Sequence, residues 1–167
     1  MTYMTNCKES CVSFIPSSST EWFKISELGE MRPGDPGSWV QGKVALGSPV
    51  NVSLPLDLPA GEYLVRNEII SLQNAQTVGG AEYYPSCLQI SLKLGGNVVA
   101  SPTVHFPGAY SETDPGILGN VRRWQSCFWI FADETVVLQS WTELHVSGGS
   151  CVNFEGQVEQ YRRHCDH

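Results

Sequence analysis

The sequence lacks long apolar runs, and it has few charged side chains. No stretch of about eighteen consecutive apolar residues occurs, so we expect no membrane-spanning helix. Only 16% of the residues are charged, and 17 acidic against 10 basic residues give a net charge of -7. The basic residues are scattered, apart from the pairs Arg122–Arg123 and Arg162–Arg163. This pattern predicts that neither nucleic acid nor an anionic membrane is a partner.

Motifs of several common enzyme classes are missing too. The chain contains no GxSxG elbow, no P-loop and no CxxC zinc pattern. Its first ten residues, MTYMTNCKES, have neither the basic start nor the apolar core of a signal peptide. That start does not favour export, whereas the six cysteines do, because that number in a chain of 167 residues favours an oxidising compartment.

The composition favours a single all-β domain. A length of 167 residues suits one domain with its own core, and 16 glycines and 10 prolines favour strands and turns over long helices. Alternation and turn signals predict a hairpin between residues 50–54 and 62–72, joined by a turn at LPAGE. Further strands are predicted at 22–25, in the alternating segment that begins at Cys87, and at 134–139. Residues 101–120 are expected to form an irregular loop.

The segment RNEIISLQ, residues 66–73, mixes polar and apolar side chains in an unusual way. In a strand, Arg66 and Glu68 share one face while Asn67 and Ile69 share the other. A polar group buried without a partner costs roughly 1–3 kcal/mol. The segment is therefore either an edge strand with solvated polar groups or a strand that flanks a specific site.

Several motifs in order resemble the C-terminal part of a lytic polysaccharide monooxygenase of auxiliary activity family 9, formerly glycoside hydrolase family 61. They are CKESC, EWFKISELG, PGSW, LPAGEYLVRNEIISL, GAEYYPSCLQISL and PGAYSETDPGIL. The resemblance implies an immunoglobulin-like or fibronectin-like β-sandwich that is incomplete at its N-terminal side. It assigns residues 1–120 to this sandwich and leaves 121–167 as a divergent tail, expected to pack on the same domain. It also implies a secreted, fungal type of enzyme that oxidises β-1,4-glucan, with cellulose or a related glucan surface as its partner.

The same resemblance implies a copper site whose ligands are mostly missing. The family holds copper with an N-terminal histidine and a second histidine, and Tyr84 falls on the family's tyrosine near the metal's axial position. Here position 1 is Met, and no histidine precedes His105. Asn67 and Glu82 stand where the family usually has histidine and glutamine beside the metal. Copper is therefore the family's cofactor, but we expect this chain to bind none.

The resemblance also bears on the cysteines and on how the chain ends. It implies a Cys7–Cys11 disulfide, whereas the family's partner of Cys87 would lie upstream of this chain. The partners of Cys87, Cys127, Cys151 and Cys165 stay open. A natural truncated relative and an aberrant gene model both account for the short start and the divergent tail.

Other candidate residues have simpler interpretations. The HCDH end at 164–167 carries metal-ligand types but is read as a frayed terminus, and His145 as a surface or strand residue. Glu112 and Asp114 are read as loop acids rather than a glycosidase pair. Trp22 and Trp39 are expected in the core. Asn51 begins a glycosylation sequon, NVS, which matters only if the chain is exported.

Three functions therefore remain open. The chain is a copper monooxygenase by lineage, inactive in this form, or a non-catalytic carbohydrate-binding or interaction protein on the same fold, or an inert fragment.

Overall fold

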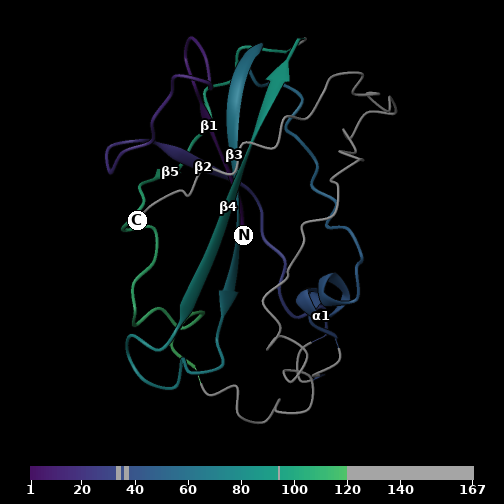
Figure 1. The fold of residues 1–167 in the computed structure, drawn as a ribbon, viewed down its shortest axis with the longest axis vertical. Coiled ribbons are helices and arrows are strands. Elements are labelled where there is room, and N and C mark those ends of the chain that lie inside the picture. The colour runs from purple at the N-terminus through teal and green to yellow at the C-terminus, as the bar shows by residue number, and fades with distance from the viewer. Residues whose placement is uncertain (33–34, 36–37, 94, 120–167) are drawn as a thin grey trace.

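The computed structural model describes residues 1–32, 35, 38–93 and 95–119, which form an antiparallel β-sheet with one short helix. The sheet has the strand order β4-β3-β1-β2-β5, and all its pairings are antiparallel (Figure 1). Its elements are β1 (Thr2–Asn6), β2 (Trp22–Ser26), α1 (Val40–Ala45), β3 (Gly61–Ser71), β4 (Glu82–Leu92) and β5 (Thr103–Val104). The prediction of an all-β fold is confirmed.

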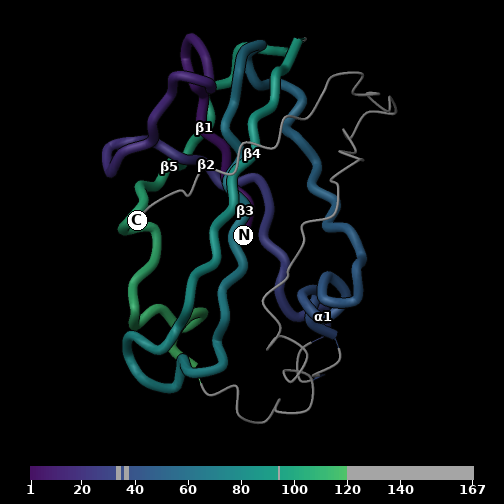
Figure 2. Tube along the Cα trace, in the orientation of Figure 1, coloured from purple at the N-terminus to yellow at the C-terminus, as the bar shows by residue number. Residues whose placement is uncertain are grey.

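The strands predicted at 22–25 and 62–72 are present as β2 and β3, but the predicted 50–54 strand is wrong. Those residues form an irregular segment, and β3 pairs with β1 on one side and β4 on the other. Both edges of β3 are thus occupied, so residues 50–54 have no free edge of it to join. Figure 2 shows this blue segment rising from α1 beside the sheet.

Strand β1 was not predicted at all. Tyr3 and Met4 are adjacent and point to opposite faces of the sheet, yet their exposed fractions are only 1% and 0%. A strand buried on both faces loses the alternation that marks a strand in sequence. The six-residue helix α1 and the two-residue β5 were also missed, and β5 lies in the segment expected to be irregular.

Strand β4 begins at Glu82, whereas the sequence placed its start at Cys87 and read residues 82–86 as loop. Pro85 and the preceding glycines Gly79 and Gly80 favour a loop. In the sheet of described residues β4 is an edge strand, where a proline is tolerated because its missing N–H can face away from the ladder. This error matters because it removed Tyr84 from the strand.

Hydrophobic clusters lie on both faces of the sheet. On one face Tyr3 packs with the cysteines of a short loop, and on the other Met4 packs with Val65 of β3. The first cluster contains Tyr3, Cys7, Cys11, Trp22, Leu64 and Phe106, and the second contains Met4, Leu54, Leu58, Tyr63, Val65 and Ile90. The sheet is therefore a central layer of the described residues and not a surface layer.

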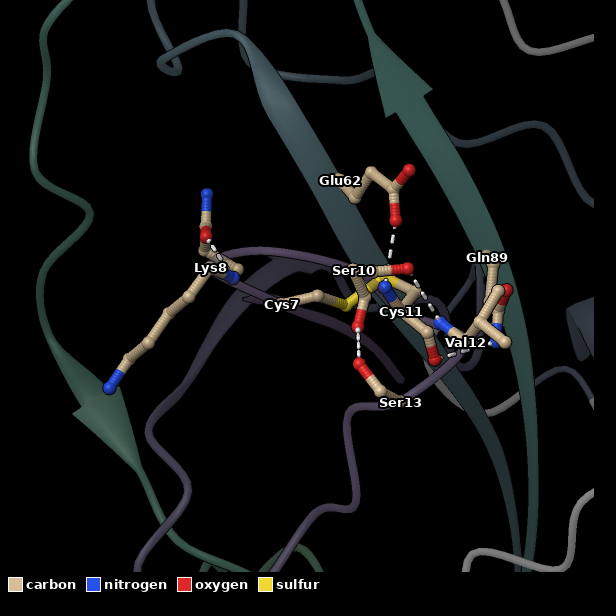
Figure 3. The surroundings of a disulfide bond; sticks show 9 residues. Cys7, Lys8, Ser10, Cys11, Val12, Ser13, Glu62 and Gln89 are labelled. Atoms are coloured by element: carbon tan, nitrogen blue, oxygen red, sulfur yellow. Dashed lines mark hydrogen bonds between the residues drawn. A yellow bond between two sulfur atoms is a disulfide. The ribbon is translucent and has the colours of Figure 1, made fainter.

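Cys7 and Cys11 form a disulfide bond, as the resemblance implied, and the loop that they close is held against β3 and β4. The Cys11 amide donates to Glu62 Oε2 at 2.7 Å, and Gln89 Nε2 donates to the Cys11 carbonyl at 3.0 Å (Figure 3). Cys87, whose partner the sequence left open, is disulfide-bonded as well. The predicted strand at 134–139 and the tail 121–167 lie outside the described residues.

Candidate functional site

The register of β3 and β4 brings Asn67, Glu82 and Tyr84 to one face of the sheet. Ile69 lies opposite Tyr84, and Ser71 lies opposite Glu82. Directly opposed residues of an antiparallel pair share a face, and so do residues two apart on one strand. The three residues that the sequence singled out thus come from two adjacent strands and point to the same side.

Tyr84 and Glu82 are both exposed, and 56% of the Tyr84 surface is accessible. Its hydroxyl donates a hydrogen bond to Glu82 Oε2 at 2.5 Å. This bond is the main reason that the pKa of Tyr84 is raised above its ordinary value, with slight burial and the Glu82 charge adding to it. The phenol is therefore held in its neutral form by a neighbour on its own strand.

Asn67 is half-buried and is engaged with β1. Its Oδ1 accepts a hydrogen bond from the Thr2 hydroxyl at 3.3 Å, and Thr2 lies directly opposite it in the β1–β3 pairing. The amide thus has a partner across the ladder, on the side of β3 away from Tyr84 and Glu82. Asn67 acts here as a link between the two central strands.

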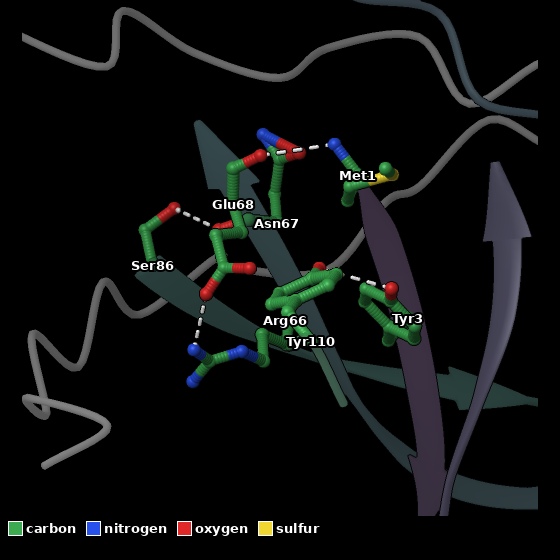
Figure 4. Close-up of polar contacts among 7 residues, drawn as sticks. All are labelled: Met1, Tyr3, Arg66, Asn67, Glu68, Ser86 and Tyr110. Carbon is green, nitrogen blue, oxygen red and sulfur yellow. Dashed lines mark hydrogen bonds and ion pairs between the residues drawn. The ribbon is translucent and has the colours of Figure 1, made fainter. Parts of the chain in front are cut away.

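The contacts on the opposite face of β3 explain why this strand carries so many polar groups. Arg66 and Glu68 are buried, with exposed fractions of 8% and 2%, and they form an ion pair with each other (Figure 4). The Arg66 guanidinium also lies 4.2 Å from the centroid of the Phe106 ring. Each charge therefore has a specific partner, so the alternative of an edge strand with solvated polar groups is wrong.

Tyr110, in the loop that follows β5, packs against this buried network. Its hydroxyl donates to the Tyr3 hydroxyl at 2.9 Å (Figure 4), and its ring stacks on Tyr83 with centroids 5.5 Å apart. Burial, the Tyr3 hydrogen bond and the nearby Glu68 carboxylate keep the pKa of Tyr110 far above its ordinary value. This face is a structural core, and the Tyr110 phenol in it stays protonated near neutral pH.

Comparisons with known proteins identify the family of this chain. The family model of Auxiliary Activity family 9 (formerly GH61) matches residues 1–128. This chain belongs to that family. It is 44% identical over 117 residues to AA9 family lytic polysaccharide monooxygenase D of Gloeophyllum trabeum, covering 70% of this chain and 33% of the relative.

Solved structures agree with this assignment. The extended catalytic domain of H. jecorina LPMO9A superposes with a TM-score of 0.59 at 35% identity, covering 71% of this chain and 48% of that one. A cellulose-active polysaccharide monooxygenase from M. thermophila gives a TM-score of 0.54 at 30% identity, covering 70% and 54%. The fold is thus that of the family's β-sandwich. This chain spans between about a third and about half of these relatives.

The family match includes β1, which the sequence motifs did not use, and continues past residue 120 to residue 128.

The resemblance to the family raises the question of whether the residues around Tyr84 fit a copper ion. The possible ligands there are one phenol, one carboxylate and one amide, and the phenol is hydrogen-bonded to the carboxylate. Cu(I) prefers soft or imidazole ligands, so this donor set does not fit copper.

His105 does not bring an imidazole to Tyr84. It follows β5 at one edge of the described sheet, whereas Tyr84 lies on β4 at the other edge, with three strands between them. Its Nδ1 lies 3.1 Å from the Thr20 carbonyl oxygen. Among the described residues no group of three or more histidine, cysteine, aspartate or glutamate side chains could hold a metal ion.

The remaining candidates fall mostly where the sequence placed them. Trp22 is 2% exposed and lies in the core as expected, whereas Trp39 is only half-buried, and its backbone forms an isolated β-bridge with Glu30. Asp114 accepts a hydrogen bond from the Ser111 amide at 2.8 Å, so it shapes a turn of its own loop. His145 and residues 164–167 lie outside the described residues. Over the ranges that are described, no helix is long and apolar enough to cross a membrane.

The sequence did not find the buried network of Arg66, Glu68, Tyr110 and Tyr3. One signal was present, because two opposite charges two positions apart fall on one face of an otherwise apolar strand. Tyr110 carried no such signal, since it lies in a loop rich in proline and glycine, and Tyr3 lies in the strand that was missed.

Proposed function

We propose that this polypeptide descends from copper monooxygenases that oxidise β-1,4-glucan and does not itself carry out that oxidation. Membership of family 9 places it in a lineage of oxidative polysaccharide cleavage. The observation that carries the proposal is the hydrogen bond from Tyr84 to Glu82 on a face that receives no described imidazole.

The residues beside Tyr84 do not form a copper site by themselves. Glu82 brings a charge that is satisfied by the Tyr84 hydroxyl, and Asn67 keeps a neutral amide that is bonded to Thr2. Such groups tune a metal site, typically by 10- to 100-fold in affinity or activity, but tuning requires ligands that hold the ion first. Restoring the family's residues at these two positions should therefore restore nothing.

Product analysis on cellulose tests this directly. The parent and the variant Asn67→His/Glu82→Gln are incubated with cellulose, copper and a reductant, and soluble oligosaccharides are examined for oxidised ends. We expect none above the level given by copper and reductant alone. Oxidised products from either protein above that control would overturn the proposal.

A second candidate function is non-catalytic binding to a β-glucan surface. It is favoured by Tyr84, which is 56% exposed on the edge strand β4 of the described sheet. Exposed aromatic rings present the apolar area that a sugar face can cover. A cellulose pull-down of the parent and Tyr84→Ala separates this function from an inert fragment: loss of binding in the variant supports it, and no binding by the parent excludes it.

We also propose that the protein acts outside the cell, in line with its lineage. The Cys7–Cys11 disulfide supports this, because disulfides form and persist in oxidising compartments. Export of the native chain, detected by mass spectrometry of the culture medium, is the corresponding test.

A further inference from the structure

The segment between α1 and β3 carries a feature that the proposed function does not use. Residues 51–53 read Asn-Val-Ser, which is an acceptor sequon for N-linked glycosylation with a permitted middle residue. It is the only Asn-X-Ser or Asn-X-Thr sequence in the 167 residues, so a single position decides the question.

The structure presents this sequon in an accessible form. Asn51 and Ser53 are exposed, while Val52 and Leu54 are buried with exposed fractions of 6% and 4%. The segment is therefore held to the core by its alternate apolar residues, and the two sequon side chains lie on its solvent side. Neither the Asn51 amide nor the Ser53 hydroxyl is hydrogen-bonded to another described residue, so modification breaks no interaction there.

The backbone of the sequon also belongs to no ladder. Residues 50–54 are irregular, and both edges of β3 are occupied by β1 and β4. A bulky group on Asn51 is thus compatible with the sheet and with the buried contacts of Val52 and Leu54. A carbohydrate chain needs such a site, because it is large and must stay in water.

A second, independent observation concerns the compartment. The Cys7–Cys11 disulfide is typical of a chain that matures in an oxidising compartment, and in eukaryotes the secretory pathway is where sequons are also glycosylated. We propose that Asn51 is N-glycosylated. This rests on the proposed extracellular location and on nothing about copper or glucan.

The transfer balances without any redox change. The donor is a lipid-diphosphate-linked oligosaccharide, and a new bond joins Asn51 Nδ2 to C1 of its first sugar. The bond between that C1 and the phosphate oxygen breaks, and the lipid diphosphate leaves. The amide gives up one proton to the transferase or solvent, and Ser53 supplies the hydroxyl that the acceptor sequence requires.

The experiment directs the full chain into the secretory pathway of a eukaryotic host behind an added leader. The secreted and cell-associated fractions are both digested and mapped by mass spectrometry before and after peptide-N-glycosidase treatment in heavy-oxygen water. We expect most Asn51 peptides to carry hexose-containing mass before treatment and heavy-labelled aspartate after it. Asn51→Gln and Ser53→Ala should abolish the label, and Ser53→Thr should keep it.

The Cys7–Cys11 disulfide, mapped in the same digests, shows that each variant entered the oxidising compartment. Parent and Ser53→Thr chains that contain this disulfide but carry unmodified Asn51 in both fractions would overturn the proposal. Because a supplied leader sets the location, failure here is distinct from failure of the proposed extracellular function.

Discussion

The Tyr84 hydroxyl donates a 2.5 Å hydrogen bond to the carboxylate of Glu82, two residues earlier on the same face of β4. In relatives of this family the corresponding tyrosine is expected to face the metal. In this chain its hydroxyl has a neighbouring carboxylate as its partner. The Tyr84 hydroxyl is therefore already engaged in a hydrogen bond and is not a free donor for a metal ion.

The first prediction concerns the titration of Tyr84. Glu82→Gln removes the charged group that accepts the hydrogen bond of the phenol, so the pKa of Tyr84 should fall toward its ordinary value of about 10. The folded-state pKa in the parent is the higher one, so the pair's stabilisation is complete below about pH 10 and is lost as the pH rises further. NMR of the tyrosine ring carbons, assigned with Tyr84→Phe, measures this.

Glu112→Gln is the matched control for that titration. Burial, the Glu68 charge and then the Glu112 charge raise the pKa of Tyr83, whereas Glu112 is not among the causes of the raised Tyr84 pKa. It should leave the Tyr84 curve in place. An unchanged Tyr84 curve in Glu82→Gln would show that the hydrogen bond does not form in solution.

The second prediction concerns the buried Arg66–Glu68 pair. Arg66→Met or Glu68→Leu alone leaves an uncompensated buried charge and should lower the free energy of unfolding by about 3–5 kcal/mol. The double variant should cost less than the sum, by about 0.5–3 kcal/mol. Urea denaturation of the parent, the two single variants and the double variant measures the coupling energy in a double-mutant cycle.

The exposed Lys24–Glu27 pair provides the comparison for that cycle. Its side chains are 42% and 65% exposed, so Lys24→Met should change the free energy of unfolding by less than about 1 kcal/mol. Additive effects of the two buried substitutions would mean that the charges are not coupled and that the ion pair is not formed.

The third prediction concerns the Cys7–Cys11 loop. Both cysteines are buried, so alanine is the replacement that avoids burying a hydroxyl. Cys7→Ala/Cys11→Ala should lower the free energy of unfolding by about 2 kcal/mol, from the loop-closure entropy of a five-residue ring. Non-reducing peptide mapping identifies the bond, and free thiols at both positions in protein from an oxidising compartment would refute it.

The sequence predicted strands that turn signals delimit, including β3, which is buried on both faces. β2 and β3 were found because their ends carry clear turn signals. β1 was missed because Tyr3 and Met4 are both buried, and the start of β4 was missed because Pro85 is tolerated on an edge. These are tertiary facts that no local pattern contains.

The candidate site was found differently. Asn67, Glu82 and Tyr84 were identified by resemblance, and no periodicity linked positions 15 or more residues apart. Only the register, with Ile69 opposite Tyr84, shows that they share a face. The Tyr84–Glu82 hydrogen bond needed the start of β4 at Glu82, because in a loop the two side chains would have no fixed relation.

Calorimetric titration with copper tests the central claim most directly, because it asks whether these residues hold the metal at all. We expect the parent, Tyr84→Phe and Asn67→His/Glu82→Gln to give the same weak, substoichiometric heats of adventitious surface sites. The parent's donors near Tyr84 are oxygen atoms and an amide, which make a poor site for copper, and the double variant adds a single imidazole, which does not complete a copper site by itself. One stoichiometric site with submicromolar affinity in the parent, lost in Tyr84→Phe, would contradict the account.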